Sequence, residues 1–133
     1  MLADESRRVR AALRRLLEDE GFQIVTEADN GIAAVADVRR YRPEVALLDV
    51  RLPGLDGLSA AREILSHVPG THVVICTAVA GVEDPARKLG AFAVVAKGSH
   101  PTLLVGTIHR ALAQARPSAT GPFGGEETMR RPA

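Results

Sequence analysis

Acidic, hydroxyl and lysine side chains end or directly follow short apolar runs at four places in this sequence. These side chains are Asp4, Glu5, Asp49, Thr77 and Lys97. If the apolar runs are parallel strands, their carboxyl ends share one edge of a sheet, and ligands bind at that edge where the strand order reverses. We therefore expect the three carboxylates to converge there, with the hydroxyl and the ammonium group beside them.

Three neighbouring carboxylates repel one another unless a cation lies among them. Carboxylate oxygens favour a hard ion, and Mg²⁺ is typically held by one or two carboxylates, several waters and a phosphate. Lys97 adds a compact positive charge that suits a phosphoryl oxygen. The set predicts a phosphoryl-transfer site in which Asp49 is the nucleophile, because aspartate forms acyl phosphates. The turn signal Pro53-Gly54 bends the chain so that the backbone carbonyl of Arg51 faces the cation.

The elements that must position this chemistry alternate between two periods along the chain. The expected strands are 23–28, 45–49, 71–77 and 93–96, and the expected helices are 6–20, 32–40, 58–68, 84–90 and 101–115. This alternation predicts an α/β fold with a doubly wound, five-stranded parallel sheet of order 2-1-3-4-5. Residues 1–3 form a short first strand, so either the protein begins upstream of Met1 or this central strand is short.

Helix boundaries carry their own signals. Ser6 and Asp56 are expected to cap helices, and Gly21 ends the first helix. Asp84 is expected to cap a short helix with Pro85 at its first position.

The composition indicates one ordinary domain. The chain has 133 residues, of which 46% are hydrophobic and 25% charged, and 17 Lys and Arg residues nearly balance 16 Asp and Glu. This balance, with 3% aromatic residues, argues against direct nucleic-acid binding. The lone Cys76 excludes a disulfide framework, and without a membrane span or signal pattern we expect a cytoplasmic protein. Residues 1–115 form the expected domain, and the Pro/Gly-rich residues 116–133 a disordered tail.

Four motifs carry a family resemblance. LADES (2–6), LLDVRLPGLDG (47–57), CTA (76–78) and AKGS (96–99) resemble, in order, those of the response-regulator receiver domain of bacterial two-component systems. The resemblance implies a flavodoxin-like fold and phosphorylation of Asp49 by a histidine kinase, a phosphotransfer protein or a small phosphodonor. It implies Mg²⁺ ligands at Asp4, Glu5, Asp49 and the Arg51 carbonyl, and phosphate contacts from Thr77, Ala78 and Lys97.

The chain departs from the family pattern at several points. Val94 stands where receivers usually carry a switch aromatic, and Pro85 is expected to shorten the fourth helix. Residues 116–133 are too few for the family's helix-turn-helix output domain, which needs on the order of 60 residues. We therefore expect a stand-alone receiver, not a turnover enzyme, that acts through an unknown downstream protein or as a homodimer formed by its 85–115 face.

Other readings remain open at this point. A degenerate receiver would bind partners without phosphorylation, and an aspartyl phosphatase would need a second acid where Arg51 stands. The arginines of the 6–20 helix form either a solvated face or a docking surface for a kinase. The histidines are expected at the surface; they are His67, His72, His100 and His109.

Overall fold

The computed structural model describes residues 1–114 as a five-stranded parallel sheet of order β2-β1-β3-β4-β5 with five helices. The predicted fold class and strand order are therefore confirmed. The strands are β1 (Leu2–Ala3), β2 (Glu27–Ala28), β3 (Val45–Leu48), β4 (His72–Thr77) and β5 (Ala93–Ala96). The helices are α1 (Arg7–Asp19), α2 (Gly31–Tyr41), α3 (Gly57–His67), α4 (Glu83–Leu89) and α5 (Pro101–Ala113).

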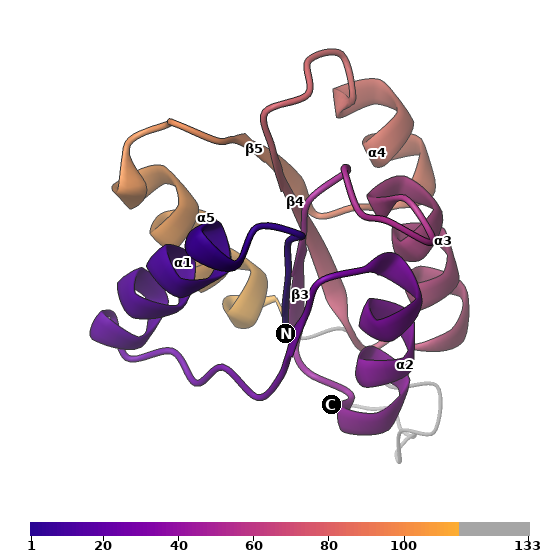
Figure 1. Ribbon diagram of the computed structural model, residues 1–133, viewed down its shortest axis with the longest axis horizontal. Coiled ribbons are helices and arrows are strands. Elements are labelled where there is room, and N and C mark those ends of the chain that lie inside the picture. The colour runs from indigo at the N-terminus through magenta and orange to yellow at the C-terminus, as the bar shows by residue number, and fades with distance from the viewer. Residues whose placement is uncertain (115–133) are drawn as a thin grey trace.

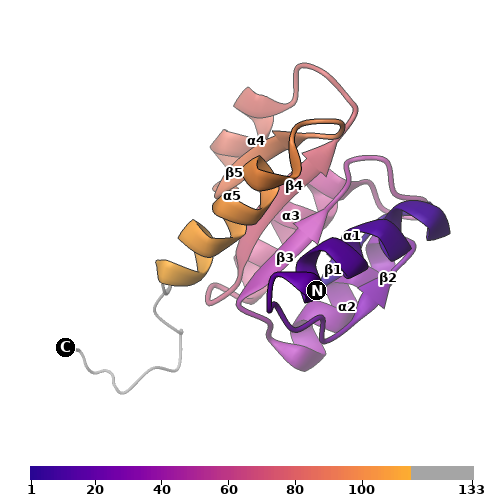
Figure 2. The same cartoon turned by 90° about the vertical axis from the view of Figure 1, so that its left-hand side faces the viewer.

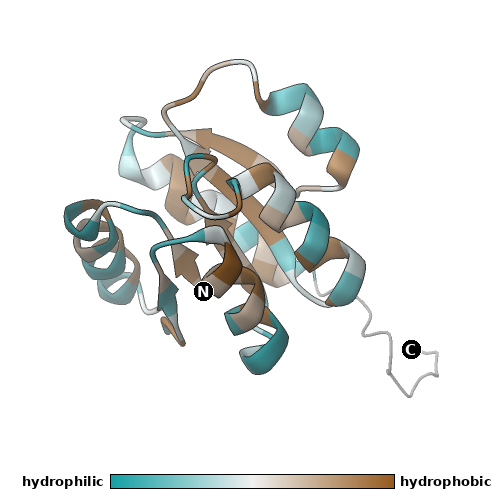
Figure 3. Cartoon of the chain, turned by 45° about the vertical axis from the view of Figure 1, so that its right-hand side comes forward, coloured by the Kyte–Doolittle hydropathy of each residue, from teal (hydrophilic) through white to brown (hydrophobic). Residues whose placement is uncertain are grey.

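The helices cover both faces of the sheet (Figure 1 and Figure 2). Helices α1 and α5 lie on one face, and α2, α3 and α4 lie on the other. Because side chains alternate along a strand, Leu47 packs in the cluster under α1 and α5 whereas Ala46 and Leu48 pack in the cluster under the other helices. Figure 3 shows the resulting pattern: the strands inside are hydrophobic, and the helices carry hydrophilic residues on their outer sides.

Two of the three N-terminal caps expected from the sequence are present. The Ser6 side chain accepts a hydrogen bond from the Val9 amide, and Asp56 accepts from the Leu58 and Ser59 amides. The expected cap at Asp84 is wrong, because α4 begins at Glu83, two residues before the expected first position, and Val82 is its cap, without a side-chain hydrogen bond. Pro85 therefore occupies the third helical position, where an amide would have no acceptor within the helix.

Strands β1 and β2 are both short, and the length of β1 limits the length of β2. β1 pairs Leu2 and Ala3 with Glu27 and Ala28 on one side, and with Leu47 and Leu48 on the other. The sequence predicts the second strand over 23–28, but only its last two residues are paired as a strand. Since β1 offers only two residues as partners, the preceding segment continues without a strand opposite it.

One histidine lies elsewhere than expected. His67, His100 and His109 are exposed, whereas His72 is buried at the start of β4. Its ring lies edge-on to that of Phe92, and its Nε2 atom bonds the Gln114 carbonyl oxygen. His72 is buried despite its polar ring because it lies on β4, between two other strands.

The predicted tail 116–133 and residue 115 of the predicted domain lie outside the described residues. Within residues 1–114, no helix is long and apolar enough to cross a membrane. Cys76 is buried, as expected for a small core residue.

Candidate functional site

Lys97 joins two buried carboxylates at the carboxyl edge of the sheet. Its Nζ atom lies 2.6 Å from Asp4 Oδ2 and 2.7 Å from Asp49 Oδ2. Asp4 is 2% exposed and Asp49 is 5% exposed, while the lysine side chain is 25% exposed. The ammonium group thus pairs with both aspartates and is more exposed to solvent than either of them.

The second oxygen of each carboxylate is also bonded. Asp49 Oδ1 accepts hydrogen bonds from the Thr77 hydroxyl at 2.7 Å and from the Arg51 amide at 3.3 Å. Asp4 Oδ1 accepts from the Ser6 amide at 2.8 Å. For Asp49 these donors favour the ionised form, because charge-assisted hydrogen bonds stabilise the charged acceptor.

The pKa directions follow from these contacts. Burial alone would raise the pKa of Asp49, but the hydrogen bonds from Lys97 and Thr77 outweigh it and hold that pKa below its ordinary value. Burial alone would lower the pKa of Lys97, but its bonds to Asp4 and Asp49 raise it. At neutral pH the site therefore contains an ionised Asp49 beside a charged ammonium group.

The sheet register explains why these residues meet. Ala3 lies opposite Leu48, Leu48 lies opposite Ile75, and Thr77 lies opposite Ala96. The residues that follow β1, β3 and β5 therefore emerge within one residue of the level of Thr77. Backbone bonds continue this alignment, from the Asp49 amide to the Ala3 carbonyl and from the Lys97 amide to the Thr77 carbonyl. The convergence of Asp4, Asp49, Thr77 and Lys97 expected from the sequence is thus what the fold produces.

Glu5 and Ala78, which the sequence also predicts at this site, lie nearer the solvent than Asp4 and Asp49. Both are exposed, and in the described part of the chain no three His, Cys, Asp or Glu side chains are already gathered into one metal-binding group. Val94, at the expected switch position, is partly buried and packs against the core cluster under α2, α3 and α4. Arg51 is exposed.

The donor chemistry nevertheless fits a hard divalent cation. One ammonium charge faces two carboxylates, Asp4 and Asp49, so the cluster keeps a net negative charge. Exposed Glu5 adds a further carboxylate beside Asp4 in the chain. Oxygen ligands with an excess of negative charge are those that Mg²⁺ prefers.

Sequence reasoning missed a second layer around Asp4. Arg10 donates from Nη1 to the Asp4 carbonyl oxygen at 2.6 Å, and its Nε lies 3.5 Å from a Glu27 carboxylate oxygen. Arg14 also pairs with Glu27, and with Glu18 one turn along α1. Part of the arginine run therefore ties α1 to β2 instead of forming a uniform solvated face. In the sequence, the only indication of these ion pairs is Glu27, near the end of the expected strand 23–28.

Sequence reasoning also missed two close contacts between glycines and the backbone of the loop after Asp49. A Cβ atom on Gly57 would lie 1.9 Å from the Asp49 carbonyl oxygen, and one on Gly31 would lie 1.8 Å from the Leu55 carbonyl oxygen. The Gly31 amide donates to the Pro53 carbonyl. The 49–57 loop is therefore packed directly against the beginnings of α2 and α3, which only glycine permits.

Comparison with known proteins gives a consistent result. The sequence pattern of the response regulator receiver domain matches residues 1–109. The chain is similar to the chemotaxis protein CheY of Halobacterium salinarum, with 38% identity over 88 residues that cover 66% of this chain and 72% of CheY. The response regulator GacA of Pseudomonas viridiflava is 34% identical over 119 residues, 87% of this chain but only 56% of GacA.

A solved structure is similar to this chain over most of its length. The signal receiver domain of the response regulator NarL from Mycobacterium tuberculosis aligns with a TM-score of 0.80 and 31% identity, covering 84% of this chain and 93% of that one.

Proposed function

Because this chain belongs to the response regulator receiver family, we propose that it is a signalling receiver phosphorylated on Asp49 in a Mg²⁺-dependent reaction. The proposed phosphodonor is the phosphohistidine of a histidine kinase or of a phosphotransfer protein. The observation that carries the proposal is the buried, ionised Asp49 carboxylate held between the Thr77 hydroxyl and the Lys97 ammonium group.

The proposed reaction is one displacement at phosphorus. An oxygen of the Asp49 carboxylate forms a bond to phosphorus while the bond from phosphorus to the donor nitrogen breaks, and the departing imidazole takes up a proton. The low pKa of Asp49 keeps the nucleophile ionised at neutral pH. Asp4, Glu5, Asp49 and the Arg51 carbonyl would hold Mg²⁺, which would neutralise charge on the transferring phosphoryl group.

Lys97 and Thr77 have matching roles in this proposal. Lys97 contacts both aspartates with one ammonium group, so a phosphoryl oxygen on Asp49 would lie within its reach. The Thr77 hydroxyl already donates to Asp49 and would donate to a phosphoryl oxygen in its place. Exposed Ala78, next in the chain, would leave room for the phosphate.

The signal would leave the domain through protein contacts. We propose an unknown downstream protein or a homodimer formed by the 85–115 face, and a cytoplasmic location, without a direct role for nucleic acid or membrane. Leu103 of α5 is a large apolar side chain exposed on that face. Since Val94 offers no aromatic ring to rotate, the output would follow from a smaller rearrangement than the usual receiver switch.

Intact-mass measurement after incubation with acetyl phosphate and Mg²⁺ tests this proposal. The chain is expected to gain one phosphoryl group, and Asp49→Ala or a chelator is expected to abolish the gain. Asp56→Ala is the matched control, because Asp56 lies in the same loop but is exposed and only caps α3. Phosphorylation that persists in Asp49→Ala, or is lost in Asp56→Ala alone, contradicts the assignment.

A second candidate is the degenerate receiver, which binds partners without phosphorylation. It is favoured by one observation, that Val94 is packed into the core with no aromatic ring to report the state of the site. A correctly folded chain that gains no phosphoryl group from acetyl phosphate but still binds a partner protein would favour this alternative.

A further inference from the structure

The guanidinium group of Arg10 bonds the peptide group that joins Asp4 to Glu5. Its Nη1 atom lies 2.6 Å from the Asp4 carbonyl oxygen. Asp4 is 2% exposed, and a buried carbonyl group without a hydrogen-bond donor is costly. Within residues 1–114, Arg10 is the donor to this carbonyl. The contact therefore lies on the acidic turn itself, although Arg10 belongs to α1.

The sheet does not supply this donor because β2 is too short. The Asp4 amide donates to the Ala28 carbonyl at 3.1 Å, as in a regular parallel ladder. The next bond of that ladder would run from the Asn30 amide to the Asp4 carbonyl, but β2 ends at Ala28 and Asn30 caps α2. The Arg10 side chain thus takes the place of a strand amide.

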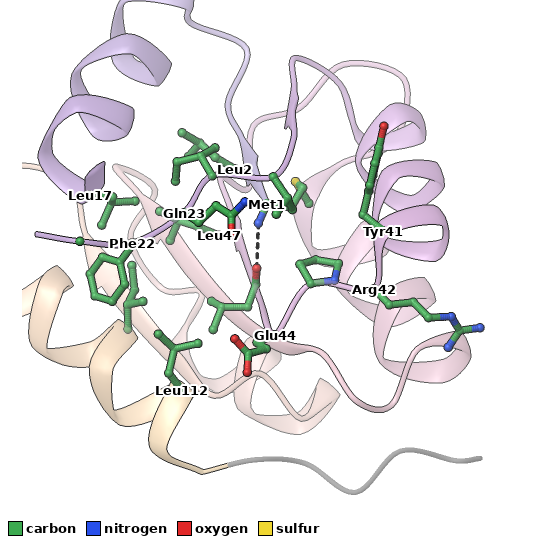
Figure 4. A pocket seen from close by; sticks show the side chains of 16 residues that line it. Met1, Leu2, Leu17, Phe22, Gln23, Tyr41, Arg42, Glu44, Leu47 and Leu112 are labelled. Atoms are coloured by element: carbon green, nitrogen blue, oxygen red, sulfur yellow. Dashed lines mark hydrogen bonds between the residues drawn. The ribbon is translucent and has the colours of Figure 1, made fainter. Parts of the chain in front are cut away.

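The other hydrogen bonds around β1 hold the strand and the exit of the turn. At the amino end of β1 the Met1 nitrogen donates to the Val45 carbonyl at 2.9 Å, beside a cleft of about 430 Å³ (Figure 4). Beyond the carboxyl end, the Ser6 amide donates to Asp4 Oδ1 at 2.8 Å. Between these anchors, the Arg10 bond fixes the plane of the peptide group that precedes Glu5.

Glu27 holds Arg10 in place from the neighbouring strand. The Arg10 Nε atom lies 3.5 Å from one Glu27 carboxylate oxygen, and the other oxygen accepts from Arg14. The side chains of Arg10 and Glu27 are 16% and 27% exposed, so solvent screens this pair only in part. Glu27 also offsets the positive charge that Arg10 brings to a turn with two carboxylates. Arg10 can therefore donate to the turn without strongly repelling a cation there.

We propose that Arg10 is a positioning residue for the Mg²⁺ site, acting through the Asp4 carbonyl and held by Glu27. Its bond sets the peptide plane between Asp4 and Glu5, and this plane sets the directions of both carboxylates. Groups that orient metal ligands without touching the metal contribute strongly to metal affinity. The inference rests on the proposed function only in taking Asp4 and Glu5 as Mg²⁺ ligands, and it requires no phosphorylation of Asp49.

Titration of the chain with MgCl₂ alone, followed by the amide chemical shifts of Glu5 and Ser6, tests this role. In Arg10→Met the Mg²⁺ dissociation constant is expected to rise by roughly tenfold, the lower end of the effect of residues that orient metal ligands. Loss of a positive charge would by itself tighten cation binding. The sign of the change therefore separates positioning from electrostatics, and unchanged or tighter binding overturns the proposal.

Arg14→Met is the matched control. Arg14 pairs with the same Glu27 carboxylate and with Glu18, one turn along α1. Its substitution removes an equal charge and part of the same ion-pair network, so the Mg²⁺ dissociation constant is expected to stay within about twofold. Weakening equal to that in Arg10→Met would assign the effect to the network as a whole and would overturn the proposal.

Arg10→Lys provides a second variant that keeps the charge and one donor. It is expected to bind Mg²⁺ more tightly than Arg10→Met, and weaker binding than in Arg10→Met contradicts a role for the donor. Urea unfolding of each variant checks that it is folded. Failure of the unsubstituted chain to bind Mg²⁺ would overturn this inference. Normal Mg²⁺ binding without phosphorylation of Asp49 would overturn only the proposed function.

Discussion

Substituting Gly57 by alanine tests the packing of the loop that carries Asp49. The new Cβ atom would lie 1.9 Å from the Asp49 carbonyl oxygen and 2.7 Å from the Val50 Cα atom. Both contacts are with backbone, so relief requires the loop or the first turn of α3 to move. The Gly57 amide also donates to the Val50 carbonyl at 2.7 Å, and such a movement would strain this bond.

The expected size follows from two opposing effects. Forcing an extra carbon into a packed site costs typically about 1–3 kcal/mol. Alanine gains at most about 1 kcal/mol over glycine in a helix interior, and less at the first helical position. Because the clash is with backbone, the upper part of the first range applies, and we expect a net loss of about 2 kcal/mol in the free energy of unfolding.

Gly106→Ala is the matched control in the interior of α5. Its Cβ atom would meet only the end of the flexible Arg110 side chain, at 3.6 Å. We expect this substitution to stabilise the protein by roughly 0.5–1 kcal/mol, because glycine costs that much more conformational entropy than alanine in a helix.

Urea unfolding followed by circular dichroism measures both changes. With a slope of about 2 kcal/mol per molar urea, Gly57→Ala should lower the unfolding midpoint by about 1 M, and Gly106→Ala should raise it slightly. The Gly57 variant should also accept less phosphate from acetyl phosphate, since the displaced loop carries the nucleophile. A midpoint for Gly57→Ala equal to or above that of the unsubstituted chain would refute the close contact with Asp49.

Four further outcomes are expected. Thr77→Val, measured by urea unfolding, should lower stability by about 1.5–3 kcal/mol, because a buried carboxylate loses a hydroxyl donor; Thr77→Ser should retain most of it. Because Asp49 has a lowered pKa, its ionised form contributes stability that is complete above the unfolded value of about 3.9 and is lost as pH falls through the lower folded value. Thermal midpoints between pH 6 and pH 2 should show this loss, and Asp49→Asn should reduce it. Lys97→Met should destabilise the chain by about 3–5 kcal/mol at pH 7, because two buried carboxylates lose their counter-charge; an unchanged urea midpoint would contradict the bridging geometry. Burial raises the pKa of the Cys76 thiol, so Ellman's reagent should react with it far more slowly in the folded chain than in urea, whereas equal rates would show that the thiol is accessible.

The sequence was most informative where the cause of structure is local or topological. Caps at Ser6 and Asp56 depend on a side chain and an amide two or three residues away, so the pattern alone locates them. The meeting of Asp49 with Thr77 and Lys97 follows from strand order, because parallel strands end at the same edge.

It was least informative where a distant segment decides the outcome. The cap at Asp84 failed because α4 starts at Glu83, after Val82 is buried against the core. The second strand was overestimated because pairing needs a partner, and β1 supplies one for only two residues. Contacts such as that of Arg10 with the Asp4 carbonyl join an irregular turn to a helix face, and no periodicity marks them.

The ion pairs of Lys97 with Asp4 and Asp49 affect how a free cation would bind at this site. Lys97 holds an ammonium group 2.6 and 2.7 Å from the two carboxylate oxygens that an incoming cation would seek. This resident charge is tethered to β5 and cannot diffuse away, so its local concentration is fixed by the chain and not by the solution. Entry of a free cation at these oxygens would therefore be an exchange reaction, and its affinity would report the difference between two cations at Asp4 and Asp49. A phosphoryl group that drew the ammonium toward itself would shift this exchange in favour of the free ion.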